Sequence, residues 1–152
     1  MLQKRIIPTL LLHNGSLVKT IKFKNFNYIG NPANTIRIFN ELEVDEIILV
    51  DILASRENYK PDFEVIKEVA EECFMPLTYG GGLKSVHDVK KLLSIGVEKV
   101  AINTFSVESP EFISELASTF GNQCILGSID VKKDIFGKYY VIIKDGTKKT
   151  KL

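Results

Sequence analysis

Short apolar runs alternate along the chain with longer segments whose apolar residues recur at helical spacing. Continuous apolar runs of this length are typical of strands buried on both faces of a sheet. They are found at residues 5–12, 46–51, 77–79, 99–102 and 124–130. The segments between them predict helices that start at Asn31-Pro32, Asp62, Ser85 and Ser109-Pro110. The pattern therefore predicts four strand–helix units followed by a fifth strand.

Three further segments do not fit this alternation. Residues 13–31 predict a long loop, and a loop of this length in a compact domain is usually functional or mobile. Residues 139–143 predict one arm of a hairpin that turns around Phe136-Gly137. Residues 144–152 are basic and show no pattern of core residues.

Strands that alternate with helices predict an α/β fold in which helices pack outside a parallel sheet. The pattern alone leaves two architectures open. An open doubly wound sheet fits 152 residues, whereas a closed eight-stranded barrel usually needs about 250. However, the first strand is not followed by either glycine-rich phosphate-binding motif of the doubly wound nucleotide-binding folds.

Two turns at neighbouring strand ends suggest a binding site. Gly80-Gly81-Gly82 follows one predicted strand, and Asn103-Thr104 follows the next. Parallel strands end at the same edge of a sheet, so the backbone N–H groups of both turns predict a basin suited to phosphate. The alternative interpretation is that the glycines only permit a tight turn between strand and helix.

Composition narrows the class of protein. The net charge is +1 and 45% of the residues are hydrophobic, which predicts one globular domain and gives no reason to expect nucleic acid or a membrane as partner. Met1 is followed by a charged strand and not by a signal peptide, which predicts a cytoplasmic protein. Cys73 and Cys124 stand in apolar surroundings without a ligand spacing, so we expect buried thiols and neither a metal nor a cofactor.

Five segments resemble one family in a single register. RIIPTLLLHNGSLVK, DEIILVDILAS, MPLTYGGG, GVEKVAINT and CILGSIDVKK are similar to the cyclase subunit of imidazole glycerol phosphate synthase, the HisF family. The resemblance implies a (β/α)8 TIM barrel, of which residues 1–152 would be the first half plus strand five and a hairpin. It also implies a HisH-like glutaminase partner that supplies ammonia for closure of an imidazole ring.

The resemblance assigns roles at the predicted phosphate-binding end. It implies phosphate binding by Gly82, Asn103 and Thr104, and acid–base chemistry by two aspartates. One of these matches Asp130, but the other falls on Leu11, which cannot transfer a proton.

Two more residues match the family at this end of the barrel. Asp51 matches a carboxylate at the catalytic mouth, although it could equally be a strand-end or helix-cap residue. Lys19 matches a substrate-gating lysine, and its alternative is a solvated charge in a mobile loop.

At the other end of the predicted strands, the resemblance implies an ammonia gate and a surface for the glutaminase. Arg5, Glu46 and Lys99 match a charged ring, and Glu98 stands where the family usually has aspartate. Thr78 matches a threonine along the ammonia route. The alternatives are that the charged residues form ordinary ion pairs and that Thr78 is a core residue of its strand.

Three hypotheses follow from this pattern. The first is an ammonia-handling relative of the cyclase subunit that binds a phosphorylated ligand but lacks normal cyclase chemistry, of the kind associated with amidation of surface sugars. The second is a working cyclase of histidine biosynthesis, in which another group replaces the missing aspartate. The third is a non-catalytic half-barrel with two open parallel edges, which should aggregate or pair.

Overall fold

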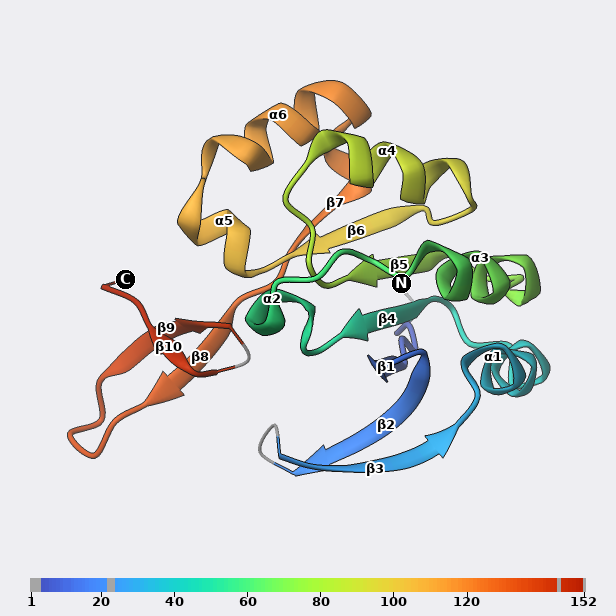
Figure 1. Ribbon diagram of the computed structural model, residues 1–152, viewed down its shortest axis with the longest axis horizontal. Coiled ribbons are helices and arrows are strands. Elements are labelled where there is room, and N and C mark those ends of the chain that lie inside the picture. The colour runs from blue at the N-terminus through green and yellow to red at the C-terminus, as the bar shows by residue number, and fades with distance from the viewer. Residues whose placement is uncertain (1–3, 22–23, 145, 152) are drawn as a thin grey trace.

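A computed structural model describes residues 4–21, 24–144 and 146–151. Within these ranges a seven-stranded sheet has the order β3-β2-β1-β4-β5-β6-β7 (Figure 1). Its parallel strands are β1 (Thr9–His13), β4 (Ile47–Asp51), β5 (Leu77–Gly80), β6 (Lys99–Ile102) and β7 (Ile125–Gly127). The predicted succession of parallel strands is confirmed, and Met1 and Leu152 lie outside the described residues.

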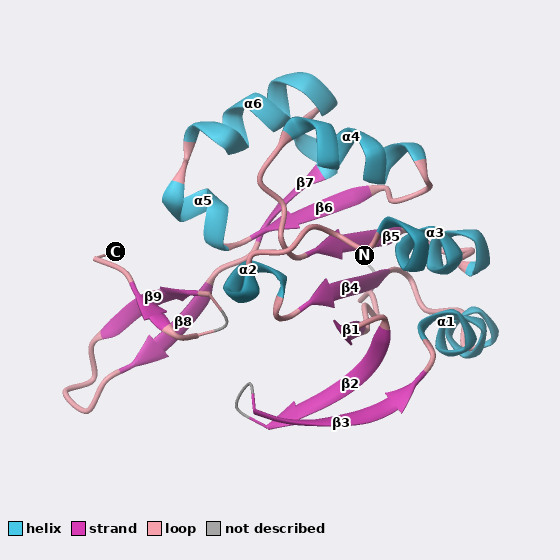
Figure 2. Cartoon of the chain, in the orientation of Figure 1, coloured by secondary structure: helices cyan, strands magenta, loops and turns pink. Residues whose placement is uncertain are grey.

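The longer helices connect these strands in turn. They are α1 (Pro32–Glu41), α3 (Phe63–Glu72), α4 (Val86–Ser94) and α6 (Glu111–Phe120). The side chains of Asn31, Asp62 and Ser85 cap three of them by accepting the backbone N–H three residues further on. The short helices α2 (Ala54–Glu57) and α5 (Thr104–Glu108) follow the carboxyl ends of β4 and β6, and neither was predicted (Figure 2).

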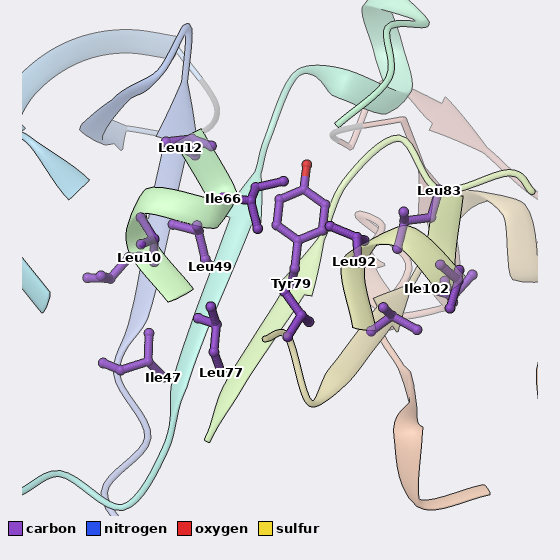
Figure 3. Close-up of a cluster of buried hydrophobic side chains, with 14 of the residues drawn as sticks. Leu10, Leu12, Ile47, Leu49, Ile66, Leu77, Tyr79, Leu83, Leu92 and Ile102 are labelled. Atoms are coloured by element: carbon purple, nitrogen blue, oxygen red, sulfur yellow. The ribbon is translucent and has the colours of Figure 1, made fainter. Parts of the chain in front are cut away.

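The main core lies between the sheet and the longer helices. Alternate strand residues such as Leu49, Leu77 and Tyr79 are fully buried in one cluster with helix residues such as Ile66 and Leu92 (Figure 3). A doubly wound sheet would bury helices on both faces. Helices on one side of a curved parallel sheet are instead the arrangement of a partial TIM barrel, which settles the choice between the two architectures.

The opposite face of the sheet carries smaller residues in register. We call these the inner row: Leu11, Val50, Gly80, Ala101 and Leu126. Leu11 and Val50 are half-buried, and Leu126 of the edge strand β7 is 39% exposed. The inner row is therefore less completely covered than the outer core.

The prediction of a long loop at residues 13–31 is wrong. β2 (Ser16–Ile21) pairs antiparallel with residues 11–13 of β1, and β3 (Lys24–Gly30) pairs antiparallel with β2. The turn between β1 and β2 is Asn14-Gly15, with φ of 48° and 70°, and this dipeptide is typical of two-residue hairpins. Because β2 covers the carboxyl end of β1, the expectation of two open parallel edges is also wrong on this side.

The buried strand predicted at residues 124–130 is also wrong. β7 is only three residues long and lies exposed at the edge of the sheet, after a 3-10 helix η1 (Asn122–Cys124). Asp130 does not end this strand but begins β8 (Asp130–Lys133), which belongs to a second sheet of order β10-β9-β8. The break falls at Ser128 and Ile129, where the chain leaves the edge of the main sheet.

The second sheet contains the predicted hairpin. β9 (Tyr139–Ile143) pairs antiparallel with β8, and the turn contains Phe136-Gly137 as expected. The carboxylate of Asp134 accepts hydrogen bonds from the backbone N–H groups of Phe136 and Lys138, both at 2.9 Å. The basic segment after β9, which shows no pattern of core residues in the sequence, includes β10 (Lys148–Lys149).

Two simpler expectations concern the cysteines and the helices. Cys73 and Cys124 are free thiols as predicted, but both are only half-buried, and burial raises the pKa of Cys73. In the described ranges no helix is both long and apolar enough to cross a membrane.

Candidate functional site

A cavity of about 260 Å³ lies at the carboxyl ends of the parallel strands. Its lining includes six of the residues singled out from the sequence, which are Leu11, Asp51, Gly82, Asn103, Thr104 and Asp130. They come from distant parts of the chain, and the parallel sheet brings their strand ends together. Lys19 is exposed on β2 and does not line the cavity. The functional roles of all these residues remain predictions.

The glycine turn after β5 forms one wall of the cavity. Gly81 has φ of +129°, and a Cβ atom there would lie 2.6 Å from the carbonyl oxygen of Asp51. Gly82 has φ of +66°, and its Cβ would lie 2.6 Å from the carbonyl oxygen of Tyr59. The close contact of Gly81 with the end of β4, and that of Gly82 with the segment after α2, therefore require glycine at both positions. The same contacts place the backbone of the turn at the cavity surface.

Asn103 and Thr104 form the adjacent wall, where β6 passes into α5. The side-chain nitrogen Nδ2 of Asn103 donates a hydrogen bond to Oδ2 of Asp130 at 3.1 Å. The buried hydroxyl of Thr104 accepts the backbone N–H of Lys144 at 3.1 Å, which joins the second sheet to the cavity wall. A hydroxyl that accepts one hydrogen bond can still donate its own proton. Thr104 therefore keeps a donor for a ligand.

Asp51 lies at the end of β4 and is almost completely buried. Its Oδ1 accepts hydrogen bonds from the hydroxyl of Tyr59 at 2.6 Å and from the N–H of Leu53 at 3.3 Å. Burial raises the pKa of Asp51, although these hydrogen bonds partly oppose the rise. The hydrogen bond from Leu53 agrees with the interpretation of Asp51 as a helix-cap residue. Its place in the cavity wall also agrees with contact between Asp51 and a ligand. Tyr59 was not predicted, because no local pattern links it to Asp51.

Leu11 and Asp130 both line the cavity, where the resemblance would place two aspartates. Leu11 stands in register between Val18 of β2 and Val50 of β4, so its surroundings are apolar. Asp130 is half-buried and held by Asn103. In this cavity only one member of the expected acid–base pair is therefore a carboxylic acid.

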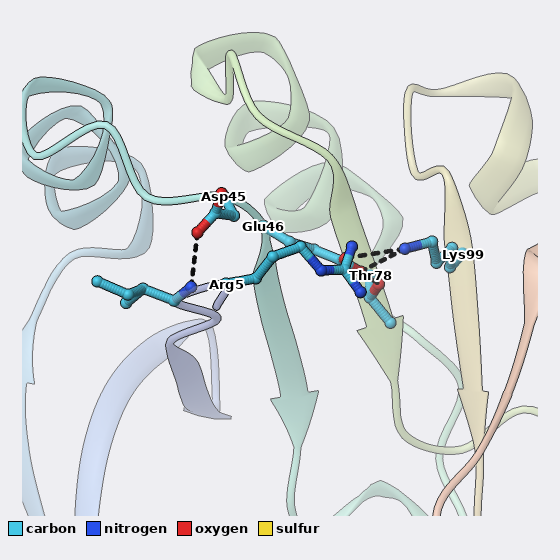
Figure 4. A network of polar contacts seen from close by, with 6 residues as sticks. Arg5, Asp45, Glu46, Thr78 and Lys99 are labelled. Atoms are coloured by element: carbon cyan, nitrogen blue, oxygen red, sulfur yellow. Dashed lines mark hydrogen bonds and ion pairs between the residues drawn. The ribbon is translucent and has the colours of Figure 1, made fainter. Parts of the chain in front are cut away.

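A charged cluster lies at the opposite end of the same strands (Figure 4). We define it as Arg5, Glu46, Thr78 and Lys99. Both carboxylate oxygens of Glu46 accept hydrogen bonds from Lys99 Nζ at 2.8 Å, and Oε1 also accepts the hydroxyl of Thr78 at 2.9 Å. Arg5 Nη1 lies 3.7 Å from Glu46 Oε2. One buried carboxylate thus joins three strands and the segment before β1.

The environment of Glu46 favours its charged form. Burial opposes ionisation, but the hydrogen bonds from Lys99 and Thr78 and the charges of Lys99 and Arg5 outweigh it, so the pKa of Glu46 is lowered. Glu98 is exposed and takes no part in these contacts of the charged cluster. Within the described ranges, no group of three or more His, Cys, Asp or Glu residues is placed to hold a metal.

We expect Glu46→Gln to lower the free energy of unfolding by about 1–3 kcal/mol at neutral pH, because Lys99 and Arg5 would lose their shared counter-charge. A lowered folded pKa stabilises the protein above the unfolded pKa, and this stabilisation is lost as pH falls through the folded pKa. The difference between wild type and variant should therefore shrink below about pH 4. Urea denaturation at both pH values measures it.

Glu72→Gln is the matched control for this prediction. Glu72 pairs with Arg37 at 2.6 Å, but both side chains are substantially exposed, so its loss should cost no more than about 1 kcal/mol. Equal effects of the two substitutions at neutral pH would contradict the importance of the buried cluster.

Residues 5–152 match the family described as Histidine biosynthesis protein. The chain belongs to this family.

Several relatives within the histidine biosynthesis family are similar along nearly the whole chain. A protein of Leptospira interrogans, provisionally named imidazole glycerol phosphate synthase subunit HisF, is 51% identical over 99% of this chain and 59% of its own length. The provisionally named subunit hisF2 of Pseudomonas aeruginosa is 51% identical over 99% and 60%. Imidazole glycerol phosphate synthase subunit HisF of an Exiguobacterium species is 44% identical over 100% and 59%.

The chain thus spans about 60% of the length of these relatives. The histidine biosynthesis family has the (β/α)8 barrel fold, and the parallel strands and outer helices described above correspond to part of such a barrel. The expected HisF-like fold is confirmed on this basis.

Proposed function

We propose that this chain is part of a HisF-like subunit that receives ammonia from a HisH-like glutaminase and delivers it toward a phosphorylated ligand. The observation that carries the proposal is the placement of two polar sites on one sheet. The charged cluster lies at the amino ends of the strands, and the cavity lies at their carboxyl ends. The inner row separates them along the face that would form the inside of a barrel.

The charged cluster suits a gate facing a partner. The side chains of Arg5 and Lys99 are 63% and 31% exposed, whereas that of Glu46 is 6% exposed. The cations are thus available to a docking surface while the carboxylate closes the entrance behind them. Thr78 stands directly beside Glu46 and would line the route once the Glu46–Lys99 pair separates. A complete protein that does not bind the glutaminase in sedimentation experiments would remove this part of the proposal.

The cavity suits the phosphate group of a small ligand. The backbone of Gly82 and the start of α5 meet at its surface, and Thr104 offers a hydroxyl donor. Backbone and hydroxyl donors bind phosphate without needing a cation in the wall.

The cavity does not suit the family's usual acid–base chemistry, because leucine occupies the position of the first aspartate. We therefore propose that normal cyclase turnover is absent. The ammonia acceptor would be a different compound, such as a sugar amidated by a separate enzyme.

A working cyclase is the second candidate, and one observation favours it. The carboxylate of Asp51 lines the same cavity as Asp130, and burial raises its pKa in the direction that suits a general acid. Asp51 could then replace the missing aspartate. Its hydrogen bonds to Tyr59 and Leu53 weigh against this role, because they hold the carboxylate in the turn.

Phosphate binding tests the cavity. Thr104→Val should weaken the binding of inorganic phosphate to the complete protein by about 10- to 100-fold in calorimetric titration, because the variant lacks the hydroxyl donor.

Thr78→Val is the matched control for that titration, since it removes a hydroxyl at the opposite end of the same sheet. Unchanged binding in the Thr104 variant, or equal weakening in both variants, would contradict a phosphate site in the cavity.

A further inference from the structure

Positive charge is concentrated in the second sheet. Residues 130–151 contain seven lysines and three aspartates, whereas the other residues contain thirteen lysines and arginines and sixteen acidic residues. The small net charge of the whole chain therefore hides a basic segment attached to an acidic body. A segment of one sign at the rim of a cavity attracts ligands of the opposite sign.

Strand pairing places part of this charge on one face of the sheet. Lys132 is directly opposite Tyr140, and Lys149 is directly opposite Ile142, so these four side chains share a face. They line a second cavity of about 270 Å³, which we call the basic pocket. The described residues that line it are Lys132, Lys133, Asp134, Tyr140, Ile142, Gly146, Thr147 and Lys149.

The lysines of the basic pocket form no ion pair with a described carboxylate, although Lys149 is near enough to Asp134 for their charges to interact. Within residues 4–21, 24–144 and 146–151, no carboxylate lies within ion-pair distance of Lys132, Lys133 or Lys149. Lys149 Nζ instead lies 3.1 Å from the ring centroid of Tyr140, a contact that holds a cation without removing its charge.

Asp134 is the only acid among the described residues that line the basic pocket, and its Oδ1 accepts the two backbone N–H groups of the hairpin turn. These described residues include three lysines and one aspartate, so positive charge is in excess among them.

The lysines outside the basic pocket behave differently. Lys144 and Lys148 both lie 3.4 Å from Glu108 Oε1 at the end of α5. Lys148 and Lys149 are neighbours in β10, so their side chains point to opposite faces of the sheet. The face that carries Lys148 therefore contacts α5, while the face that carries Lys149 presents its cations to solvent.

We propose that the basic pocket binds a phosphate-type anion, with Lys132 and Lys149 as its cations. The ligand class is inorganic phosphate or the phosphate ester of a small molecule. The ammonium groups of Lys132 and Lys149 come from one face of the sheet and suit a dianion with several acceptor oxygens. The Nζ of Lys133, the neighbour of Lys132 in β8, lies 5.4 Å from the ring centroid of Tyr139 instead. A neutral ligand would gain nothing from them.

The basic pocket lies next to the main cavity along β8. Asp130 lines the main cavity, and Lys132 follows two residues later on the same face of the strand, about 7 Å further on. The basic pocket would thus hold anionic ligands beside the cavity mouth. Only this link with the cavity rests on the proposed function, because the pocket itself is formed by the second sheet.

The test is a titration of the complete protein with inorganic phosphate at low salt, followed through the NMR signals of Tyr140. The double variant Lys132→Gln, Lys149→Gln should weaken phosphate binding at this signal by about tenfold. Lys148→Gln is the matched control, since it removes a neighbouring lysine from the other face and should leave binding within about twofold of wild type. Ribose 5-phosphate in a parallel titration distinguishes an ester from free phosphate.

Thr104→Val separates this inference from the proposed function. If the Thr104→Val variant loses phosphate binding in the main cavity while its Tyr140 signals respond to phosphate as in wild type, two independent sites are supported. If phosphate does not alter the Tyr140 signals of the wild-type protein, the proposed basic pocket is overturned, even if the main cavity binds phosphate. Equal weakening by the double variant and by Lys148→Gln also overturns it, as would a response to heparin without any response to phosphate.

Discussion

Replacing Leu11 with aspartate should raise the turnover of the cyclase family's ribotide substrate, supplied with ammonium salt, by about 100- to 10,000-fold in the complete protein. The substitution would restore a proton-transferring group in the cavity that already contains Asp130. Val18 and Val50 flank the position, so burial should raise the pKa of the new carboxyl group and favour a proton donor. Steady-state kinetics with saturating ammonium measure the change.

Leu11→Asn is the control for this prediction, because asparagine has nearly the shape of aspartate but cannot exchange a proton. The rate should rise with aspartate alone. Wild-type turnover at about 1 s⁻¹ or faster would contradict the non-cyclising proposal and favour Asp51 as the replacement acid. An equal rise with asparagine would show that polarity in the inner row, and not proton transfer, limits the reaction.

Gly81→Ala should lower the free energy of unfolding by about 2–5 kcal/mol. The new Cβ would lie 2.6 Å from the carbonyl oxygen and 2.8 Å from the Cβ of Asp51, and the backbone at φ of +129° disfavours any side chain. Neither contact involves the end of a flexible side chain, so the strand end or the turn would have to move. Urea denaturation measures the loss.

Gly127→Ala is the matched control. A Cβ at Gly127 would meet nothing within 4 Å, and its φ is not among the positive values. We expect a change of no more than about 0.5 kcal/mol there. A similar small change at Gly81 would show that the turn is free to rearrange, and would weaken its assignment as a fixed wall of the cavity.

The regular elements could be predicted where sequence and environment agree. Residues 99–102 and 139–143 were predicted with the boundaries of β6 and β9, because both are continuous runs of strand-forming residues with clear breaks. The helix starts at Asn31, Asp62 and Ser85 could be predicted equally well, since capping is a local interaction.

The errors arose where the usual pattern was weak or its signal was not used. The hairpin of β1 and β2 was interpreted as the start of a loop even though Asn14-Gly15 is a strong hairpin signal. The apolar run at 124–130 was interpreted as one strand, whereas the chain changes sheets at its middle. Apolar composition alone does not show whether a strand is central or at an edge.

The candidate site could be predicted only in part. Strand-end turns identify Gly82, Asn103 and Thr104 as cavity residues, because parallel strands must end together. The hydrogen bonds of Tyr59 to Asp51, of Asn103 to Asp130 and of Lys144 to Thr104 depend on how loops return to the sheet. No local pattern in the sequence contains that information.

The uneven burial of the two faces of the main sheet bears on how the protein is made. The outer core is already packed between strands and helices, while β7 ends the sheet with a parallel edge and Leu126 remains accessible. During synthesis the β7 edge would therefore be open to pairing with any other extended segment. Until that edge is paired, it offers a site for a chaperone that shields extended apolar segments.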